Sequence, residues 1–136
     1  MTTGHVDMFR KSLARCLDAP GFLEAFYDRF LGSSEEIRAK FKGTDFDRQI
    51  RVLRASLHTM AVAAQSTADG VVWPEMDRLA ELHSARGRAI SGAMYDGWLE
   101  CLVETARTHD PEFTPEIEAS WRKTLMPGID YMRSRY

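Results

Sequence analysis

Apolar side chains recur at intervals of three and four residues through nearly the whole chain, a spacing typical of helices with one buried face. A clear example begins at Leu23 and continues with Phe26, Tyr27, Phe30 and Leu31. The strict alternation that marks half-buried strands is missing, and hairpin dipeptides such as Asn-Gly cannot occur because the sequence contains no asparagine. The chain is therefore predicted to be all-α.

Glycine, proline and serine interrupt this pattern at intervals and predict about seven helices. Two of the predicted helix starts carry a capping signal. Ser33 and Glu36 have the spacing of a capping box, and Thr114 precedes Pro115 as an N-cap precedes a proline in the first turn. The predicted helices cover approximately residues 6–17, 21–31, 33–41, 45–65, 74–87 and 91–108, and a last one begins near residue 114.

The length of 136 residues suits one domain, so we expect residues 1–136 to form a single unit. The net charge of −2 gives no strong field that would attract nucleic acid or an anionic membrane. No segment has the ~20 apolar residues needed to span a bilayer, and residues 1–15 lack the apolar core of a signal peptide. Cys16 and Cys101 fall within predicted helices and suggest buried thiols in a reducing cytoplasm.

Three polar side chains lie within apolar rows where burial without a partner costs roughly 1–3 kcal/mol. Tyr27 belongs to the row that begins at Leu23, and His83 shares a face with leucines at positions 79 and 82. Gln49 begins a third row, which continues through Val52, Leu53, Ser56, Leu57, Met60, Ala61 and Ala64. Three predicted helices thus each direct one polar group inward.

Each of these signals has an ordinary explanation when it is taken alone. A single histidine on an apolar face is more often a core histidine bonded to a carbonyl than a metal ligand. A tyrosine often packs its ring and extends its hydroxyl to water, and Gln49 lies near a helix boundary. Taken together, His83, Tyr27 and Gln49 predict a cofactor site in which one group binds a metal and two offer hydrogen bonds.

Several stretches of the sequence match a known family. They are FYDRF at residues 26–30, Phe41 fourteen residues after Tyr27, DFDRQIRVL at 45–53, LAELH ending at His83, YDGWLECLVETA from Tyr95, and Trp121 within EIEASWRKTL. Together they resemble bacterial single-domain globins, including Vitreoscilla-type haemoglobin, and the haem domain of flavohaemoglobins. The resemblance implies an all-α globin fold of about seven helices around a haem pocket, with a D helix that is short or absent between Phe41 and Asp45.

The resemblance also implies roles for individual residues. His83 corresponds to the proximal histidine that holds the iron of haem b, iron protoporphyrin IX. Tyr27 and Gln49 correspond to a distal pair that donates hydrogen bonds to a bound gas, each contributing roughly 1 kcal/mol. Phe41 corresponds to the phenylalanine that packs on the haem plane, and Leu53 to an apolar neighbour that keeps the distal side dry.

On the proximal side the correspondence is looser. Ile90 would pack against the haem face, and Arg86 or Arg88 would meet a haem propionate, although both arginines suit a solvated surface equally well. Tyr95 corresponds to a tyrosine beside the proximal histidine but lies farther from His83 than in the family. The last helix contains no matching glutamate, so the strong electron push of a peroxidase is not expected.

The function implied by the resemblance is reversible binding of O2, or of another diatomic gas such as NO or CO, for storage, delivery or scavenging. The flavin and nicotinamide domains of flavohaemoglobins are absent from this sequence. An alternative is therefore nitric oxide dioxygenase or nitrite reductase activity that depends on a separate reductase. Two others are a haem-based gas sensor and a helical module that holds a different tetrapyrrole or none. The protein is expected to be a monomer or a homodimer.

Overall fold

The computed structural model describes residues 4–69 and 92–134, and every regular element in these two ranges is a helix. This confirms the all-α prediction. The helical segment predicted for residues 74–87, with His83 and Arg86, lies outside the described residues, as do Arg88 and Ile90. The described helices are α1 (Gly4–Asp18), α2 (Phe22–Gly32), α3 (Glu35–Lys40), α4 (Phe46–Asp69), α6 (Gly92–His109) and α7 (Pro115–Ser134).

The helix boundaries lie where local chemistry favours a turn or a cap. Gly21, between α1 and α2, has a positive φ of 77°, a conformation that glycine adopts without steric cost. The Asp45 carboxylate accepts hydrogen bonds from two backbone N–H groups at the start of α4. The Thr114 hydroxyl accepts the backbone N–H of Ile117 at 3.2 Å, which confirms the predicted N-cap of α7.

The predicted cap of α3 is wrong by one residue. Ser34, in an extended conformation, accepts the backbone N–H groups of Glu36 and Ile37 and is the N-cap. The hydroxyl of Ser33 instead donates to the carbonyl of Phe30 at 2.6 Å, so this side chain helps to end α2. Two adjacent hydroxyls fit the same cap, and the sequence pattern alone does not distinguish them.

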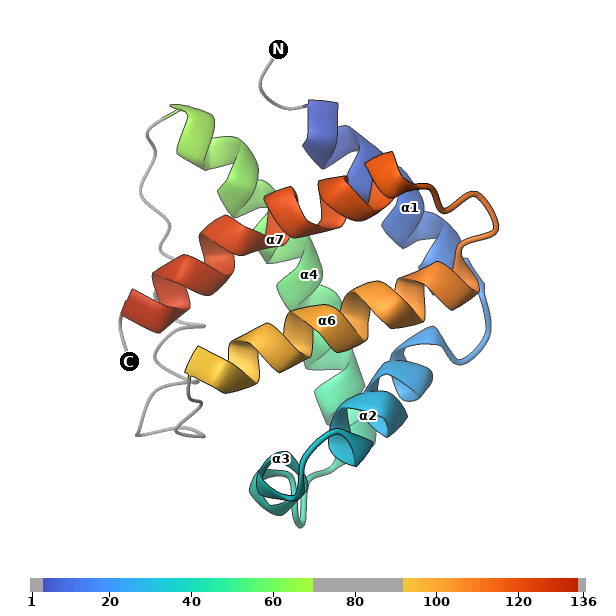
Figure 1. Cartoon of the computed structure of the whole chain (residues 1–136), viewed down its shortest axis with the longest axis vertical. Helices are drawn as coiled ribbons and strands as arrows, with labels where there is room; N and C mark the ends of the chain where they lie inside the picture. The colour runs from blue at the N-terminus through green and yellow to red at the C-terminus, as the bar shows by residue number, and fades with distance from the viewer. Residues whose placement is uncertain (1–3, 70–91, 135–136) are drawn as a thin grey trace.

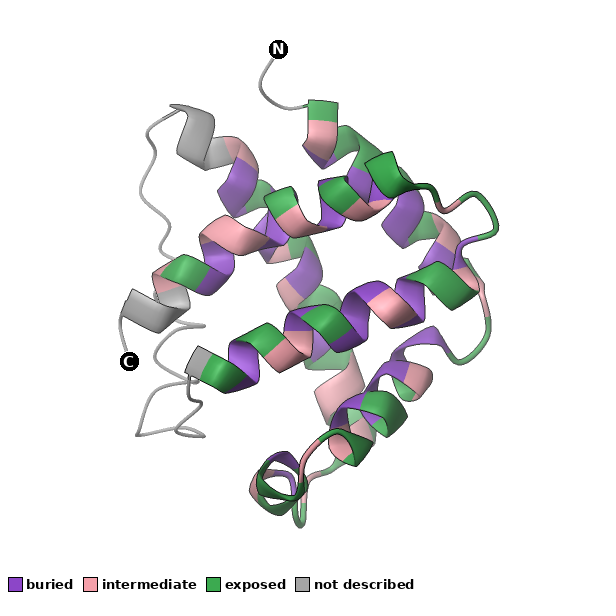
Figure 2. Ribbon diagram, viewed as in Figure 1, coloured by how far each residue is buried: buried purple, intermediate pink, exposed green. Residues whose placement is uncertain are grey.

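The helices cross one another around a shared core. In Figure 1, α6 and α7 run antiparallel across the front of the molecule, and α4 crosses behind them. Helix α1 packs mainly against α7, α2 against α6, and α4 against α7, while α3 lies beside α2. Buried residues line the inner faces of these helices (Figure 2), so the core lies between the crossing helices.

Trp121 of α7 is fully buried at the centre of this core. Phe9 of α1 meets its ring edge-on at 4.8 Å between centroids, and Phe22 of α2 does so at 6.4 Å. The predicted apolar rows are confirmed for most positions, with one clear correction on α4. Val52, which was expected to face inward, is 36% exposed, whereas Leu53 beside it is buried.

A buried polar network fastens α1 to the turn between α6 and α7. Asp110 accepts hydrogen bonds from Arg15 at 2.6 and 3.0 Å and from Ser12 at 2.6 Å. The indole N–H of Trp121 donates to the Ser12 hydroxyl at 2.9 Å. Burial by itself raises the pKa of the Asp110 carboxyl, but the hydrogen bonds from Arg15, Ser12 and the backbone N–H of Glu112 outweigh it and hold the pKa below its ordinary value.

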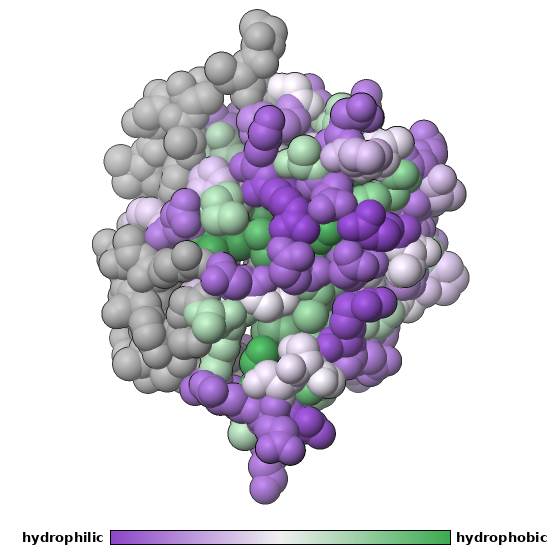
Figure 3. Space-filling view, in the orientation of Figure 1, coloured by the Kyte–Doolittle hydropathy of each residue, from purple (hydrophilic) through white to green (hydrophobic). Residues whose placement is uncertain are grey.

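Charged side chains also connect the outer faces of α6 and α7. Arg107 pairs with Glu118 at 2.6 Å, and Arg122 pairs with Glu100 and with Glu118. Hydrogen bonds from these arginines hold the pKa values of Glu100 and Glu118 below the ordinary range. On the face shown in Figure 3, hydrophilic residues lie over much of the described surface, and hydrophobic residues show between them.

Cys16 and Cys101 are buried free thiols, as predicted. Burial raises the pKa of the Cys16 thiol to about 12. A thiol with such a pKa stays protonated at neutral pH and is a poor nucleophile, so its role is packing. In the two described ranges, no helix combines the length and the apolar character that a membrane span requires.

Candidate functional site

The side chain of Tyr27 enters the interior from α2, as its position in the apolar row predicts. Tyr27 is 5% exposed. Three phenylalanine rings meet the Tyr27 ring edge-on, with centroids at 5.0 Å for Phe26, 5.5 Å for Phe46 and 6.0 Å for Phe41. This packing fixes the plane of the phenol and leaves its hydroxyl as the polar feature of an aromatic wall.

Phe41 and Phe46 flank the turn between α3 and α4. Phe41 directly follows α3 and is 7% exposed, and Phe46 is the first residue of α4. The two rings stack with centroids 6.2 Å apart and an interplanar angle of 28°. Phe30 of α2 meets Phe41 edge-on at 6.1 Å. We call Phe26, Tyr27, Phe30, Phe41 and Phe46 the aromatic cluster.

Gln49 and Leu53 follow Phe46 along one face of α4. Gln49 is half-buried in the first turn, where its backbone N–H donates to the carbonyl of Asp45 at 2.9 Å. Leu53, one turn further, is 4% exposed. Since Phe46 touches Tyr27, the face of α4 that carries Gln49 and Leu53 is the face turned towards α2.

The role of Phe46 was missed in the sequence, although a signal for it exists. Phe46 precedes Gln49 by three residues and Leu53 by seven, which is the spacing of one helix face. With a helix that starts at Asp45, this spacing predicts that Phe46 lies on the same face as the two predicted distal residues. The contact between Tyr27 and Phe41, by contrast, joins α2 to the turn after α3 and depends on tertiary packing.

Tyr95 lies on α6 and is 4% exposed. Its predicted partner His83 lies outside the described residues, so the relation between the two stays a prediction. The other three histidines occupy different surroundings. His58 is exposed on α4, His5 accepts a hydrogen bond from Thr124 through its carbonyl, and His109 contacts the Phe22 ring at 5.5 Å.

The chemistry available at this site combines apolar surface with two hydrogen-bonding side chains. Aromatic and aliphatic side chains from α2, α3 and α4 exclude water, and Tyr27 and Gln49 add a phenol and an amide that donate hydrogen bonds. Within the parts of the chain described by the structure, no group of three His, Cys, Asp or Glu side chains is placed to hold a metal ion. The described wall therefore offers hydrogen-bond donors and apolar surface.

Comparisons with known proteins concern the family and the fold of the chain. The sequence matches the globin family over residues 24–129, well over half of the chain. The structure is similar to the crystal structure of PA3967 from Pseudomonas aeruginosa, a protein described as structurally highly homologous to a human haemoglobin. The two chains are 32% identical, the match covers 98% of each, and the TM-score is 0.91. No curated protein matches the chain.

Proposed function

The chain belongs to the globin family, with the all-helical fold of a bacterial globin, and on that premise we propose that it binds O2 or another diatomic gas reversibly on haem b. The observation that carries the proposal is the burial of the Tyr27 phenol between Phe41 and Phe46. A phenol held at an apolar wall donates its hydroxyl hydrogen to an acceptor bound beside it. A gas ligand with partial negative charge is such an acceptor.

The described residues fit a haem on chemical grounds. The aromatic cluster and Leu53 supply the apolar surface that a porphyrin needs, and Tyr27 and Gln49 supply hydrogen-bond donors from two different helices. When bound through a histidine, haem supplies an iron with one coordination position open to a diatomic gas. We assign that histidine to His83, since the other three lie on α1, on the exposed side of α4 and at the end of α6.

The remaining roles follow from the same assignment. Phe41 packs on the haem plane, and Leu53 keeps water from the gas ligand. Tyr27 and Gln49 donate hydrogen bonds that retain the ligand, each contributing about 1 kcal/mol. On the opposite side we assign packing on the haem to Ile90, and we assign to Tyr95 of α6 the role of orienting His83.

A propionate of the haem requires a cation, and the segment after His83 offers two. We assign this role to Arg86, with Arg88 as the alternative, because a guanidinium donates two parallel hydrogen bonds to a carboxylate. Replacing each arginine separately by glutamine and comparing the rates of haem loss distinguishes them.

Hemin titration tests the proposal directly. The purified protein should take up one equivalent of hemin with a Soret band, and the reduced form should bind O2 and CO reversibly. His83→Ala should release the haem or weaken its binding severely, whereas the matched control His58→Ala, at an exposed position of α4, should bind normally. A protein that develops no Soret band, or an H83A variant that binds hemin like the wild type, would contradict the assignment.

A further inference from the structure

A groove with a volume of about 530 Å³ opens beside the aromatic cluster, on the side of α3. Its lining comes from the end of α2, from α3 and from the turn that leads into α4. This volume lies within the range of roughly 300–1,000 Å³ that is typical of small-molecule sites. The lining residues are Leu31, Glu35, Arg38, Ala39, Phe41, Lys42 and Phe46.

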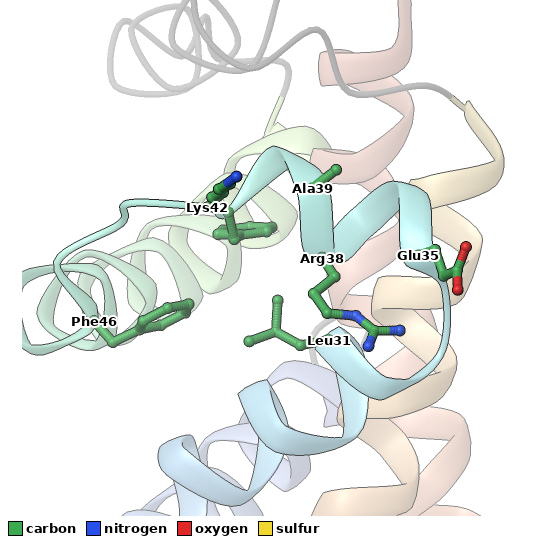
Figure 4. A pocket seen from close by; sticks show the side chains of 7 residues that line it. Leu31, Glu35, Arg38, Ala39, Lys42 and Phe46 are labelled. Atoms are coloured by element: carbon green, nitrogen blue, oxygen red, sulfur yellow. The ribbon is translucent and has the colours of Figure 1, made fainter.

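The groove has an apolar floor and a predominantly cationic rim. Figure 4 shows Leu31 and Phe46 facing one another across it, with the Arg38 side chain reaching from α3 past Leu31. The carboxylate of Glu35 points away from the groove (Figure 4). Arg38 and Lys42 are both exposed, and neither forms an ion pair with any residue that the structure describes.

We propose that this groove binds a small amphipathic carboxylate, and that its occupancy alters the hold of Tyr27 on the gas ligand. The apolar part of the carboxylate would lie against Leu31, Phe41 and Phe46. Its anionic head would accept hydrogen bonds from Arg38 or Lys42, which are otherwise unpaired in the described chain. A purely apolar molecule would leave this cationic rim unused, and a strongly polar anion would gain nothing from the apolar floor.

The groove and Tyr27 are coupled because two aromatic rings contact both of them. Phe41 and Phe46 line the groove, and the same two rings meet the Tyr27 ring edge-on at 6.0 and 5.5 Å. A ligand that shifts either ring therefore changes the packing that fixes the phenol. By linkage, any effect of the carboxylate on gas affinity must be matched by an equal effect of the gas on carboxylate affinity. This half of the proposal rests on the proposed gas-binding function.

Sodium octanoate is a suitable probe, with octanamide as its neutral analogue and acetate as its counterpart without a tail. Binding is measured by calorimetry and by the shifts of backbone amide resonances. Octanoate should saturate and move the amides of α3, Lys42 and Phe46, whereas octanamide should bind about tenfold more weakly because the charge-assisted hydrogen bond is lost. Acetate should not saturate.

Charge variants locate the anion. Arg38→Gln combined with Lys42→Gln should weaken octanoate binding about tenfold, by the same loss of charge-assisted hydrogen bonds. The control combines Arg51→Gln with Arg54→Gln, which removes the same charge from exposed positions of α4 and should leave the affinity within about twofold, since screened surface charges act weakly at a distance. Equal affinities for octanoate and octanamide, or equal effects of the two double variants, would overturn the site. Shifts at Leu53 and Leu57 without shifts in α3 would place octanoate elsewhere and overturn it too.

Coupling is then read from the O2 dissociation rate of the reduced protein at saturating octanoate. The rate should change in the wild type and stay constant in the Arg38→Gln, Lys42→Gln variant. Saturable binding without any change in this rate would overturn the coupling and leave the site standing. A protein that binds octanoate at α3 but takes up no hemin would refute the proposed function without refuting the site, so the two failures are distinguishable.

Discussion

At the scale of single residues, a substitution at Tyr27 can separate the effect of ring packing from the effect of the hydroxyl hydrogen bond. Its ring is held by Phe26, Phe41 and Phe46, and all of these contacts involve the ring. Tyr27→Phe therefore keeps the aromatic cluster and removes only the hydroxyl. Loss of a hydrogen bond of about 1 kcal/mol should raise the O2 dissociation rate about fivefold.

Stopped-flow displacement of O2 by CO measures this rate. Tyr131→Phe, at a half-buried tyrosine of α7, provides the same chemical change outside the aromatic cluster and should leave the rate unaltered. If Y27F and Y131F release O2 at the wild-type rate, Tyr27 has no distal role and its burial serves packing alone.

Residue by residue, the sequence predicts burial better than it predicts partners. Tyr27, Phe41 and Leu53 are buried as expected, because helical spacing determines which face a residue occupies. Val52 is exposed because a row written with gaps of three and four residues includes positions at the edge of the buried face. Asp110 was missed altogether, since its partners Ser12 and Arg15 are 98 and 95 positions away and no local pattern connects them.

At the scale of elements, the two serines before α3 stabilise different helix ends. Ser34 satisfies two free backbone N–H groups of α3, whereas Ser33 makes one bond to a carbonyl at the end of α2. Ser34→Ala should lower the free energy of unfolding by about 1 kcal/mol, the usual cost of an N-cap. Ser33→Ala should cost clearly less.

Urea denaturation followed by circular dichroism compares these two variants. Because they change the same atoms at adjacent positions, the comparison cancels most effects on the unfolded chain. A larger loss for S33A than for S34A would reverse the assignment of the cap and restore the spacing expected from Ser33 and Glu36.

Helix extents were predictable to within a few residues where strong punctuation exists. Pro20 and Gly21 separate α1 from α2, and Thr114 with Pro115 starts α7, because these residues act on the backbone directly. The cap of α3 and the groove beside it were not predictable in the same way. The groove depends on how far apart the end of α2 and the start of α4 are held, and that distance is a property of packing.

At the scale of the whole molecule, the buried network around Asp110 ties α1, at one end of the chain, to the turn before α7. Asp110 has a side chain with no exposure, and Arg15, its main partner, is one quarter exposed. Asp110→Asn removes the negative charge and replaces one of the two accepting oxygens by an NH2 donor, so Arg15 and Ser12 lose part of their acceptor. Because water screens part of the attraction at Arg15, we expect Asp110→Asn to cost about 2 kcal/mol at neutral pH, within the range for hydrogen bonds to charged groups.

The contribution of Asp110 to the free energy of unfolding should decrease only as the pH falls. The pKa of Asp110 is lowered in the folded protein, while in the unfolded chain an aspartate titrates near pH 4, roughly its model-peptide value. Above about pH 4 both states are ionised and the contribution is complete. As the pH falls below that value, the unfolded chain takes up a proton that the folded protein does not, and the contribution is lost as the pH passes through the folded pKa.

Urea denaturation of the wild type and of Asp110→Asn at pH 7, 5, 4 and 3 tests this directly. The difference between their free energies of unfolding should be constant from about pH 7 to pH 5 and should shrink below about pH 4. Glu100 and Glu118 also have lowered pKa values, so both proteins should lose stability in acid, and only the difference isolates Asp110. Asp130→Asn, at an exposed carboxylate of α7, should match the wild type throughout. A difference between wild type and D110N that stays constant down to pH 3 would mean that the network stabilises the fold by shape and packing, with no contribution from the ionised carboxylate.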